Sequence, residues 1–431
     1  MQFGTDGVRG RANTDLTASF ALDLGRAAAR VLGAEAAVVG GDSRLSTPML
    51  EAAFVAGVAS EGVEVHRLGV TPTPAVAFEA ARLGAMGAVV SASHNPYHDN
   101  GIKLFAVGGT KLPDDVEARI EAELADLSAP TGDPAAIHGR HGEDAAYADH
   151  LLTVLEGRDL SGMRIVVDAA NGAASHLAAE LFGRTGAQLV VINDRPDGRN
   201  INAGCGATDV AALRAVVTAE RAHVGIALDG DADRMIAVDE QGRVVDGDHT
   251  IAICAADLRA RGLLRDDTVV VTVMTNLGFR LAMERDGIRV VETKVGDRYV
   301  LEALADGGYS LGGEQSGHVI FSDHATTGDG MLTALALLDV VQRSGRQLSQ
   351  LAADAMTQLP QVLVNVPVAE RRPDIATELA DEIAAAEAEL GATGRVLIRP
   401  SGTEPLVRVM VEAPTAELAQ ATADRLAVHV R

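Results

Sequence analysis

Short apolar runs recur along the chain, and each ends in a turn of small or polar residues. Residues 36–44, 164–172 and 268–276 share one pattern: a β-rich run, a turn, and then an alanine- or leucine-rich stretch. A strand that feeds a helix in this way builds mostly parallel sheets. The recurrence therefore predicts three related α/β domains.

After Pro360 the pattern changes to strand, long helix, strand, loop, strand and final helix. The long helix, expected over residues 373–390, is rich in alanine and glutamate and has the amphipathic character of a scaffold helix. This order predicts a smaller α+β domain. Turn-forming residues at 128–134 and 157–162 mark two further breaks. We therefore expect three related α/β domains with mixed or parallel sheets at residues 1–157, 158–247 and 248–359, and a smaller α+β domain at residues 360–431, arranged around a central active-site cleft.

The apolar run at residues 85–90 leads directly into Ser-Ala-Ser-His-Asn-Pro at residues 91–96. A buried strand that ends here delivers this loop to the edge of an open α/β sheet where ligands bind. His94 and Asn95 can donate hydrogen bonds to a phosphate, and Pro96 fixes the exit of the turn. The loop favours a phosphoryl-accepting serine, although these residues alone leave an ordinary polar turn open.

A second apolar run, residues 224–228, leads into Asp-Gly-Asp-Ala-Asp-Arg at residues 229–234. Its three aspartates alternate, so their carboxylates can converge on one cation, and all-oxygen ligands suit Mg²⁺ or Ca²⁺. The alternative is a solvated acidic turn. We favour a metal site, because three aspartates at the end of an apolar strand repel one another unless a cation neutralises them. The predicted ligands are Asp229, Asp231 and Asp233.

An EF-hand calcium loop is a rival for the same segment, because Glu240 is the twelfth residue counted from Asp229. The sixth position, where that loop needs glycine for its turn, is Arg234. The flanking sequence is also typical of strands rather than helices. We therefore reject the EF-hand.

A third loop, Gly-Gly-Glu-Gln-Ser-Gly-His at residues 312–318, places Glu314 and Ser316 between glycines. Glycines let the backbone approach a ligand closely, and a carboxylate beside a hydroxyl can hold neighbouring sugar hydroxyls. As an isolated motif it is weak, and the end of a glycine-rich hairpin is the plain alternative.

A fourth loop lies at residues 399–408, where a Ser-Gly-Thr turn stands between strand-like runs. The turn can form a nest of amides and hydroxyls, and the arginines that bracket it add forked cationic donors. Single surface arginines are usually just solvated, but this bracketing favours a phosphate-binding loop. Its candidate residues are Arg399, Ser401, Gly402, Thr403 and Arg408.

These four loops follow one another in the order nucleophilic serine, metal ligands, sugar grip and phosphate dock. The arrangement is similar to the α-D-phosphohexomutase superfamily along the whole chain, and residues 3–10, Phe-Gly-Thr-Asp-Gly-Val-Arg-Gly, resemble that family's opening segment. The resemblance implies four domains, each contributing one loop to the cleft. It also implies transfer of a phosphoryl group between C1 and C6 of a hexose.

Within the superfamily the chain most resembles the bacterial phosphoglucosamine mutases. The similarity rests on Gln315, on residues 293–298, on residues 196–202 and on the Cys-Gly pair that begins at Cys205. One stretch departs, because that subfamily usually continues Cys-Gly-Ser-Thr-His and residues 205–209 here read Cys-Gly-Ala-Thr-Asp. The implied reaction interconverts glucosamine 6-phosphate and glucosamine 1-phosphate, feeding UDP-N-acetylglucosamine and cell-wall synthesis.

The family pattern assigns the phosphoserine to Ser93, the serine immediately before His94, and leaves Ser91 as a loop hydroxyl. Mg²⁺ is expected on the three aspartates and a phospho-Ser93 oxygen, with glucosamine or glucose 1,6-bisphosphate as intermediate and activator. Glu314 and Ser316 would hold sugar hydroxyls, and the fourth loop would dock the phosphate that is not reacting. The remaining candidates are Arg9, His94 and Arg234 for the developing charge, Lys103 as proton acceptor, and Lys294 and Arg298 for substrate.

Lysine use is sparse, since the only lysines in the sequence are Lys103, Lys111 and Lys294. Two of them lie in motif segments, which suggests a need for a compact donor or a deprotonatable amine. For Lys103 we expect a pKa lowered by neighbouring cations and low solvent access. Lys111 precedes Leu-Pro and is expected on a surface turn.

The composition of the chain limits the classes of molecule that it is expected to bind. The formal net charge of −23 argues against nucleic acid and anionic membranes, and no apolar run approaches the ~20 residues that span a bilayer. The start of the chain lacks a signal region, and two cysteines give no disulfide framework, which favours the cytoplasm. The expected partner is a hexosamine phosphate, and a homodimer stays open.

Three alternatives remain. The chain could be a phosphomannomutase or phosphoglucomutase of the same superfamily, because no spacing proves recognition of a 2-amino group. A silent sugar-phosphate-binding protein would not need Ser93, the aspartates or Lys103. A phosphatase would release inorganic phosphate in step with turnover.

Overall fold

The computed structural model describes residues 3–4, 6–130, 132–139, 144–370, 372–401 and 405–430. The chain divides into two compact units, one comprising Met1–Val273 and Val290–Ala352 and the other Met274–Arg289 and Ala353–Arg431. Two residues of the predicted phosphate loop, Gly402 and Thr403, lie outside the described residues.

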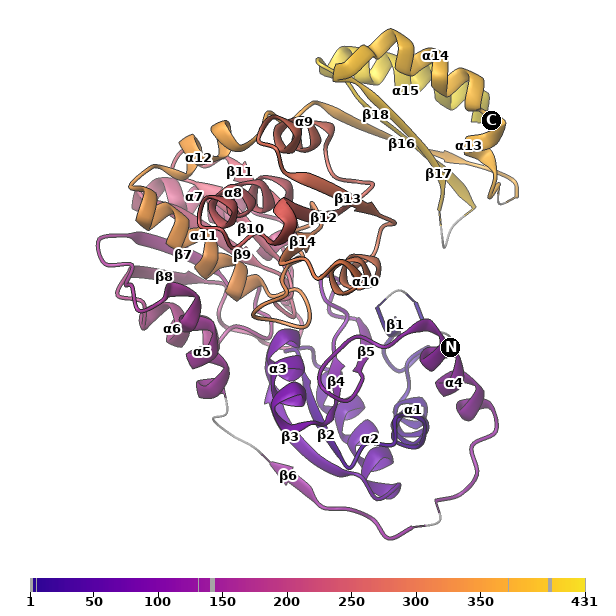
Figure 1. Ribbon diagram of the computed structural model, residues 1–431. Coiled ribbons are helices and arrows are strands. Elements are labelled where there is room, and N and C mark those ends of the chain that lie inside the picture. The colour runs from indigo at the N-terminus through magenta and orange to yellow at the C-terminus, as the bar shows by residue number, and fades with distance from the viewer. Residues whose placement is uncertain are drawn as a thin grey trace. The chain divides into compact units, whose positions relative to one another are not determined.

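The first sheet of the larger unit has the strand order β1-β5-β4-β2-β3-β6 (Figure 1). β2 pairs in parallel with β3 and β4, whereas β5 is antiparallel to both β4 and β1. Its strands are β1 (Val8–Arg11), β2 (Ala36–Gly41), β3 (Glu64–Val70), β4 (Met86–Val90), β5 (Asp99–Phe105) and β6 (Ile137–Gly139). The helices of this region are α1 (Ala18–Leu32), α2 (Thr47–Ser60), α3 (Thr73–Leu83), α4 (Asp114–Ala125) and α5 (Asp144–Leu152), followed by a 3₁₀ turn at Thr153–Leu155.

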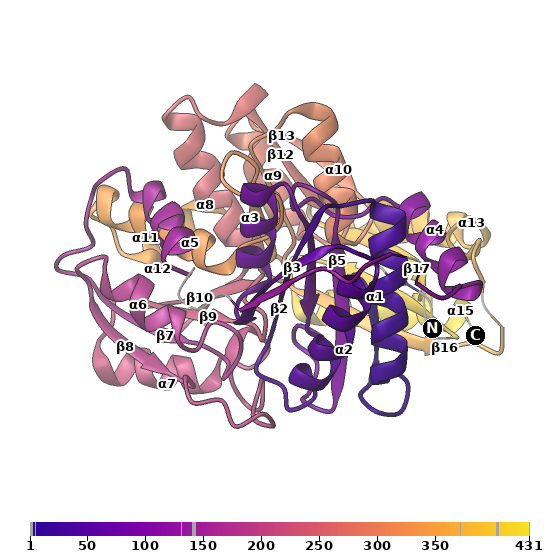
Figure 2. The same cartoon turned by 90° about the horizontal axis from the view of Figure 1, so that it is seen from below.

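Helices cover both faces of this sheet because alternate strand residues are apolar on both sides. Val39 and Ala88 belong to the core cluster formed with α1 and α2, whereas Val38 and Val89 belong to the cluster formed with α3. Figure 2 shows α1 and α2 together on one side of the strands and α3 on the other. The sheet is therefore a sandwiched α/β layer.

The second sheet has the order β11-β10-β9-β7-β8. β7 pairs in parallel with β8 and β9, and β10 is antiparallel to β9 and β11. Its strands are β7 (Arg164–Asp168), β8 (Gln188–Ile192), β9 (Val224–Leu228), β10 (Met235–Asp239) and β11 (Val244–Val245). It is accompanied by α6 (Leu177–Gly183), a 3₁₀ turn at Gly206–Thr208 and α7 (Ala211–Glu220).

The third sheet has the order β13-β12-β14-β15, with β12 parallel to β14 and β15 antiparallel to β14. Its strands are β12 (Thr268–Thr272), β13 (Arg289–Thr293), β14 (Leu311–Gly313) and β15 (Val319–Phe321). The helices of this stretch of sequence are α8 (Gly247–Ala260), a 3₁₀ turn at Arg265–Asp267, α9 (Leu277–Arg285), α10 (Asp297–Gly307), α11 (Gly330–Ser344) and α12 (Leu348–Ala355). α9 belongs to the smaller unit.

The smaller unit is built on an antiparallel sheet in the order β16-β18-β17. Its elements are β16 (Gln361–Pro367), α13 (Ile375–Glu378), α14 (Ala380–Leu390), a 3₁₀ turn at Gly391–Thr393, β17 (Arg395–Pro400), β18 (Leu406–Glu412) and α15 (Ala416–Val430). This is the α+β order expected after Pro360. The expected helix over 373–390 is divided into α13 and α14 at Leu379.

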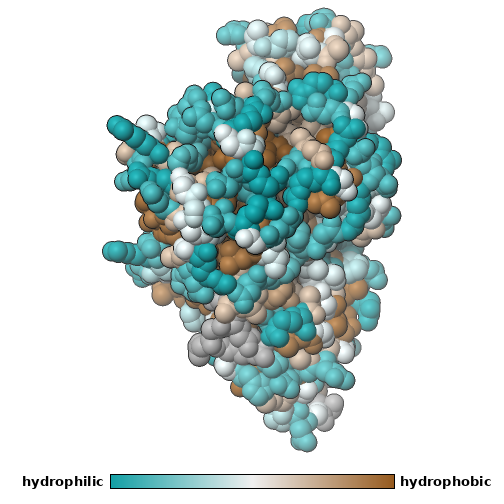
Figure 3. Space-filling model, turned by 60° about the vertical axis from the view of Figure 1, so that its left-hand side comes forward, coloured by the Kyte–Doolittle hydropathy of each residue, from teal (hydrophilic) through white to brown (hydrophobic). Residues whose placement is uncertain are grey.

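The predicted fold class is confirmed: three mixed α/β sheets precede a small α+β domain. Hydrophilic side chains cover most of the face drawn in Figure 3, and apolar patches there are small. Within the described ranges, no helix is long and apolar enough to cross a membrane.

Candidate active site

The predicted nucleophile loop connects β4 to the antiparallel strand β5, whose pairing places Val90 opposite Ile102. Ser93 is buried, and its backbone adopts φ +50°, a left-handed conformation that is unfavourable for residues other than glycine. Its carbonyl oxygen accepts hydrogen bonds from Arg44 Nη2 at 3.1 Å and Asn202 Nδ2 at 2.9 Å. These donors hold the loop in this unusual shape.

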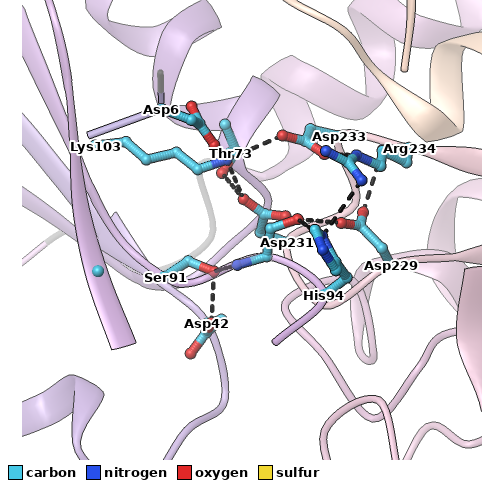
Figure 4. Close-up of polar contacts among 12 residues, drawn as sticks. Asp6, Asp42, Thr73, Ser91, His94, Lys103, Asp229, Asp231, Asp233 and Arg234 are labelled. Atoms are coloured by element: carbon cyan, nitrogen blue, oxygen red, sulfur yellow. Dashed lines mark hydrogen bonds and ion pairs between the residues drawn. The ribbon is translucent and has the colours of Figure 1, made fainter. Parts of the chain in front are cut away.

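The two serines of the loop make different contacts, and Figure 4 shows that of Ser91 with Asp42. Ser91 Oγ donates to Asp42 Oδ2 at 2.6 Å and accepts from the Ser93 amide at 3.0 Å, so it is bonded inside the loop. Asp42 in turn forms a buried ion pair with Arg44. Ser93 Oγ instead donates to Asp229 Oδ2 at 2.6 Å. Ser93 is therefore the serine whose hydroxyl reaches the aspartate cluster.

The aspartate cluster lies on the turn of a β-hairpin, where β9 ends at Leu228 and β10 begins opposite it at Met235. The strand flanks agree with the rejection of an EF-hand. Asp229, Asp231 and Asp233 are buried, and each offers an oxygen within 4.8 Å of the others. Gly230 lets this turn approach the nucleophile loop, because a Cβ there would lie 2.4 Å from the Ser93 carbonyl oxygen.

Burial and mutual repulsion set the charges of the cluster. Burial, followed by the charges of Asp233 and Asp231, raises the pKa of Asp229 well above its ordinary value. Burial works in the same direction on Asp233, but Lys103, His318 and Arg234 hold the pKa of Asp233 well below its usual range. The carboxylates of the cluster therefore repel one another.

Two oxygens of the cluster are suited to a cation. The buried Oδ1 atoms of Asp231 and Asp233 accept no hydrogen bond, although both Oδ2 atoms are hydrogen-bonded. Buried carboxylate oxygens without a hydrogen bond are costly, and a hard divalent cation is a partner that suits them. Asp233 Oδ1 has only the longer contacts to Arg234 Nε at 3.7 Å and His318 Nδ1 at 3.8 Å. The residues present therefore fit a Mg²⁺ ion.

Lys103 reaches the opposite oxygens of the same aspartates. Its Nζ lies 2.8 Å from Asp231 Oδ2, 3.0 Å from Asp233 Oδ2 and 2.9 Å from Asp6 Oδ2. Burial opposes its charge, but these carboxylates raise the pKa of Lys103 well above its ordinary value. The expected lowering of this pKa is therefore wrong: carboxylates rather than cations dominate the surroundings of the amine.

Arg9, His94 and Arg234 lie around the cluster. Arg9 Nη2 binds Asp6 Oδ2 at 2.5 Å, and Arg234 Nη1 lies 3.3 Å from His94 Nδ1. Burial, together with the charges of Arg234 and Arg9, lowers the pKa of His94 to about 4. The imidazole is thus neutral near pH 7, which makes it a hydrogen-bonding group rather than a cation.

The predicted sugar loop joins β14 to β15 beside the metal hairpin. The Met235 amide donates to the Gly317 carbonyl at 3.0 Å, and His318 Nδ1 lies 3.8 Å from Asp233 Oδ1. Glu314 is one of the carboxylates whose charge raises the pKa of Arg234 against the effect of burial. Ser316 is exposed, with its Oγ 3.5 Å from Glu314 Oε2. The nucleophile, metal and sugar loops therefore meet in one unit.

Lys294 and Arg298, which were predicted to bind substrate, have their contacts outside this cluster. Lys294 is exposed, with Nζ 5.8 Å from the centre of the Tyr299 ring. Arg298 is buried and forms ion pairs with Asp114 and with Glu117, the latter at 2.6 Å. In this conformation Arg298 joins α10 to α4, so the structure gives no support to its predicted contact with substrate.

Lys111 is also placed differently from the expectation. Its Nζ pairs with Asp6 Oδ1 at 3.4 Å and with Asp297, and its side chain is only 11% exposed. The surface turn expected at Lys111 is wrong, because this lysine links the opening segment to the start of α10.

The predicted phosphate loop belongs to the smaller unit. Arg399 on β17 pairs directly with Arg408 on β18, so both side chains leave the same face of the sheet. Burial, and then the charge of Arg408, lowers the pKa of Arg399. Among the described residues of this unit, no carboxylate forms an ion pair with either arginine, so their mutual repulsion favours binding of an anion. Ser401 is buried, and its amide donates to the Leu406 carbonyl at 2.9 Å.

The departing stretch at residues 205–209 serves the framework. The Gly206 amide donates to the buried Asp168 carboxylate at 3.0 Å. Asp209 lies just before α7 and accepts the Ala211 amide at 3.2 Å. An acidic residue here suits the positive end of a helix, which accounts for aspartate at this position.

Several residues of the site were not singled out from the sequence. Asp6, Asn202 and His318 lie within motif segments that were recognised, so their positions were available as a signal. Nothing in the local pattern marked the chemistry of the rest, since their importance comes from contacts across 49 to 158 positions of sequence. They are Asp42, Arg44 and Thr73.

Comparison with protein families gives a match over nearly the whole chain. Residues 1–130, 145–242 and 246–359 match the phosphoglucomutase/phosphomannomutase alpha/beta/alpha domains I, II and III in turn. Residues 363–428 match the C-terminal domain of the same family.

Curated relatives and solved structures agree with this match. Phosphoglucosamine mutases of Streptomyces avermitilis and Frankia alni are each 56% identical, covering 100% of this chain and 98% of theirs. A phosphoglucomutase/phosphomannomutase family protein of Burkholderia thailandensis has a TM-score of 0.84 at 25% identity, covering 99% of this chain and 97% of its own. A putative phosphomannomutase of Thermus thermophilus has a TM-score of 0.81 at 26% identity, covering 100% and 99%. The chain belongs to the phosphoglucomutase/phosphomannomutase family.

Proposed function

We propose that this protein is a phosphoglucosamine mutase, which interconverts glucosamine 6-phosphate and glucosamine 1-phosphate through a phosphoserine enzyme. The observation that carries the proposal is the 2.6 Å contact of Ser93 Oγ with Asp229, within a buried cluster where one oxygen each of Asp231 and Asp233 accepts no hydrogen bond. The amino-sugar substrate is supported by the 56% identity to phosphoglucosamine mutases along the full chain.

In the proposed reaction, phospho-Ser93 transfers its phosphoryl group to the free hydroxyl of the sugar monophosphate. The bond from phosphorus to Ser93 Oγ breaks, a bond to the sugar oxygen forms, and the sugar's hydroxyl proton ends on Ser93. The resulting 1,6-bisphosphate then returns its other phosphoryl group to Ser93. Net isomerisation leaves the enzyme phosphorylated and ready for the next substrate.

The residues take roles that suit their surroundings. Asp229, Asp231, Asp233 and a phosphoserine oxygen would hold Mg²⁺, which when bound neutralises charge on the transferring phosphoryl group. Arg9 and Arg234 supply fixed positive charge, and the neutral His94 supplies a hydrogen bond. Lys103 acts as an ammonium donor between the aspartates and Asp6, because its raised pKa makes it a poor proton acceptor.

Within each unit, candidate residues would contact a different part of the substrate. Glu314 and Ser316 would bind sugar hydroxyls that lie similarly in the two orientations, and Lys294 is exposed and accessible to substrate. Arg298 remains a candidate only if its ion pairs with α4 open. Arg399, Ser401 and Arg408, with Gly402 and Thr403, would dock the phosphate that is not reacting.

The proposal also covers the domain boundaries and the cellular location. We propose that domains end at residues 157, 247 and 359, and we expect a cytoplasmic enzyme that binds no nucleic acid. The charge of −23 and the two buried free cysteines support that setting. A homodimer stays open.

A coupled assay tests the substrate. Glucosamine 6-phosphate should be isomerised with a higher kcat/KM than glucose 6-phosphate or mannose 6-phosphate, in the presence of Mg²⁺ and a 1,6-bisphosphate. Excess chelator should stop turnover, and added Mg²⁺ should restore it. Preference for mannose or glucose phosphate would favour the second candidate, a phosphomannomutase or phosphoglucomutase, which the family's name supports. Release of inorganic phosphate in step with turnover would indicate a phosphatase.

A further inference from the structure

Thr73 links the first sheet's helix α3 to the metal hairpin of the second sheet. It is the first residue of α3 and is buried. Its Oγ1 donates to Asp231 Oδ2 at 2.7 Å, and its amide donates to the Asp231 carbonyl at 2.9 Å. Figure 4 shows its side chain beside Asp231 and Lys103. A single residue thus binds both the side chain and the backbone of a predicted metal ligand.

Because of these hydrogen bonds, the two carboxylate oxygens of Asp231 have different roles. Oδ2 receives Thr73 at 2.7 Å and Lys103 at 2.8 Å, whereas the buried Oδ1 receives no hydrogen bond. A carboxylate pinned through one oxygen has a fixed rotamer, so its other oxygen points in one direction. The free Oδ1 is therefore presented in advance to a cation, and no reorganisation is needed when the cation binds.

Thr73 is better suited than Lys103 to fix this rotamer. The lysine has a long flexible stem and shares its ammonium among three carboxylates, one of them Asp6. Threonine has a stiff β-branched side chain, and Thr73 stands between Pro72 and Pro74, whose rings restrict the backbone. The threonine is the more rigidly placed of the two donors.

We propose that Thr73 is a positioning residue that orients Asp231 for divalent metal binding. The sheet that carries the nucleophile thereby sets the metal affinity of the hairpin in the next sheet. The inference rests on the proposed function only in taking Asp229, Asp231 and Asp233 as metal ligands. Residues that orient metal ligands typically affect metal affinity by 10–100-fold.

The test compares Thr73→Val, which keeps the shape and removes the hydroxyl, with the matched control Thr73→Ser, which keeps the hydroxyl. Mn²⁺ binding to the full-length, dephosphorylated protein without sugar is measured by electron paramagnetic resonance and calorimetry. We expect Thr73→Val to raise the Kd for Mn²⁺ by roughly tenfold or more, and Thr73→Ser to stay within about threefold of wild type. Near-ultraviolet circular dichroism checks the fold, and Thr73→Ala replaces Thr73→Val if the valine variant unfolds.

Two outcomes would overturn the inference: an unchanged Kd in the variant without the hydroxyl, or an equal loss in Thr73→Ser. The first would show that the hydroxyl does not orient Asp231, and the second would show that packing of the methyl group matters instead. Because the measurement needs no sugar, it remains valid if the mutase assay fails. Conversely, if the protein is an active mutase but Thr73→Val leaves its Kd for Mn²⁺ unchanged, the proposed function stands and only this inference is wrong.

Discussion

At the residue scale, the two serines of the nucleophile loop differ in their hydrogen bonds rather than in their position on the chain. The Ser91 hydroxyl donates a hydrogen bond to Asp42 at 2.6 Å and accepts one from the Ser93 amide at 3.0 Å, so its oxygen is already engaged. Ser93 directs its hydroxyl at Asp229. We infer that Ser91 holds the loop and that Ser93 performs the chemistry.

Replacing Ser91 should separate these roles. Ser91→Ala removes the hydrogen bonds of the Ser91 hydroxyl with Asp42, the Ser93 amide and Arg44. It leaves Asp42 Oδ2 with only its arginine partner, so it should destabilise folding by about 1–3 kcal/mol. The phosphate should remain on Ser93, as measured by peptide mapping, and chemical denaturation gives the stability. A folded Ser91→Ala protein that can no longer be phosphorylated would contradict the assignment, and Ser93→Ala serves as the control.

The residue scale is also where sequence reasoning was least complete. The family pattern identified Ser93 and the three aspartates, because these stand in recognisable loops. It could not show that Lys103 lies among Asp6, Asp231 and Asp233, which are brought together only by folding across as many as 130 positions. The expected sign of the Lys103 pKa shift was wrong for that reason.

At the element scale, helix α11 begins against the metal hairpin. Its cap, Asp329, accepts the Met331 and Leu332 amides at 3.0 and 2.9 Å and the Tyr147 hydroxyl at 2.6 Å. The next residue, Gly330, donates its amide to the Ala232 carbonyl at 3.0 Å. Burial outweighs these hydrogen bonds and raises the pKa of Asp329 to about 6. The charged cap is therefore costly at neutral pH.

This pKa predicts a pH dependence of stability. A carboxyl with a raised pKa in the folded state binds its proton more tightly there, so its contribution to stability grows as pH falls from about 6 toward 4. Relative to Asp329→Asn, which cannot titrate, the wild type should gain about 2 kcal/mol between pH 7 and pH 4.5. Urea denaturation of both proteins at each pH measures the difference. A difference that is constant, or that changes in the opposite direction, would refute the shift.

The strand pair β17 and β18 presents two arginines directly opposite each other. Like charges in this position destabilise a sheet, which suggests that Arg399 and Arg408 are kept for binding an anion. Arg408→Ala should raise KM for both monophosphates by roughly tenfold or more, since a charged hydrogen bond contributes ~1.5–3 kcal/mol. It should also make turnover depend on added bisphosphate, because the intermediate escapes more readily.

The same variant should not lose thermal stability, because it relieves the repulsion between the two arginines. Arg408→Lys is the matched control, which keeps the charge without the forked donor geometry. An effect on KM for only one of the two isomers would contradict a shared phosphate dock.

The strands were the most predictable elements. The expected runs appear as β2, β4, β7, β9 and β12, each beginning within one residue of the expected position. Periodicity marks a strand but not its neighbours, so mixed sheets were expected but the strands that pair antiparallel, such as β5 and β10, were not identified. The break between α13 and α14 at Leu379 could not be predicted from the sequence either, because the residues from Ala380 onward favour a helix as much as the preceding residues do.

At the scale of the whole molecule, a chain with a formal charge of −23 must bind an anionic sugar phosphate. In the larger unit three cations, Arg9, Lys103 and Arg234, lie around the aspartates of the candidate site and offset their charge. A divalent cation on the aspartates would make the local field favourable to an anion despite the net charge of the chain. We therefore expect the overall charge to disfavour nucleic acid more strongly than a small phosphate that reaches this site.

The central claim is that Ser93 carries the phosphoryl group between the two ends of the sugar. The most direct measurement is intact-mass and peptide analysis of the wild type and Ser93→Ala after incubation with glucosamine 1,6-bisphosphate and Mg²⁺, with mutase turnover followed in parallel. We predict one added phosphate on the Ser93 peptide of the wild type, and neither phosphate nor sustained turnover in Ser93→Ala. Phosphate on Ser91, or full turnover by a folded Ser93→Ala protein, would contradict the mechanism.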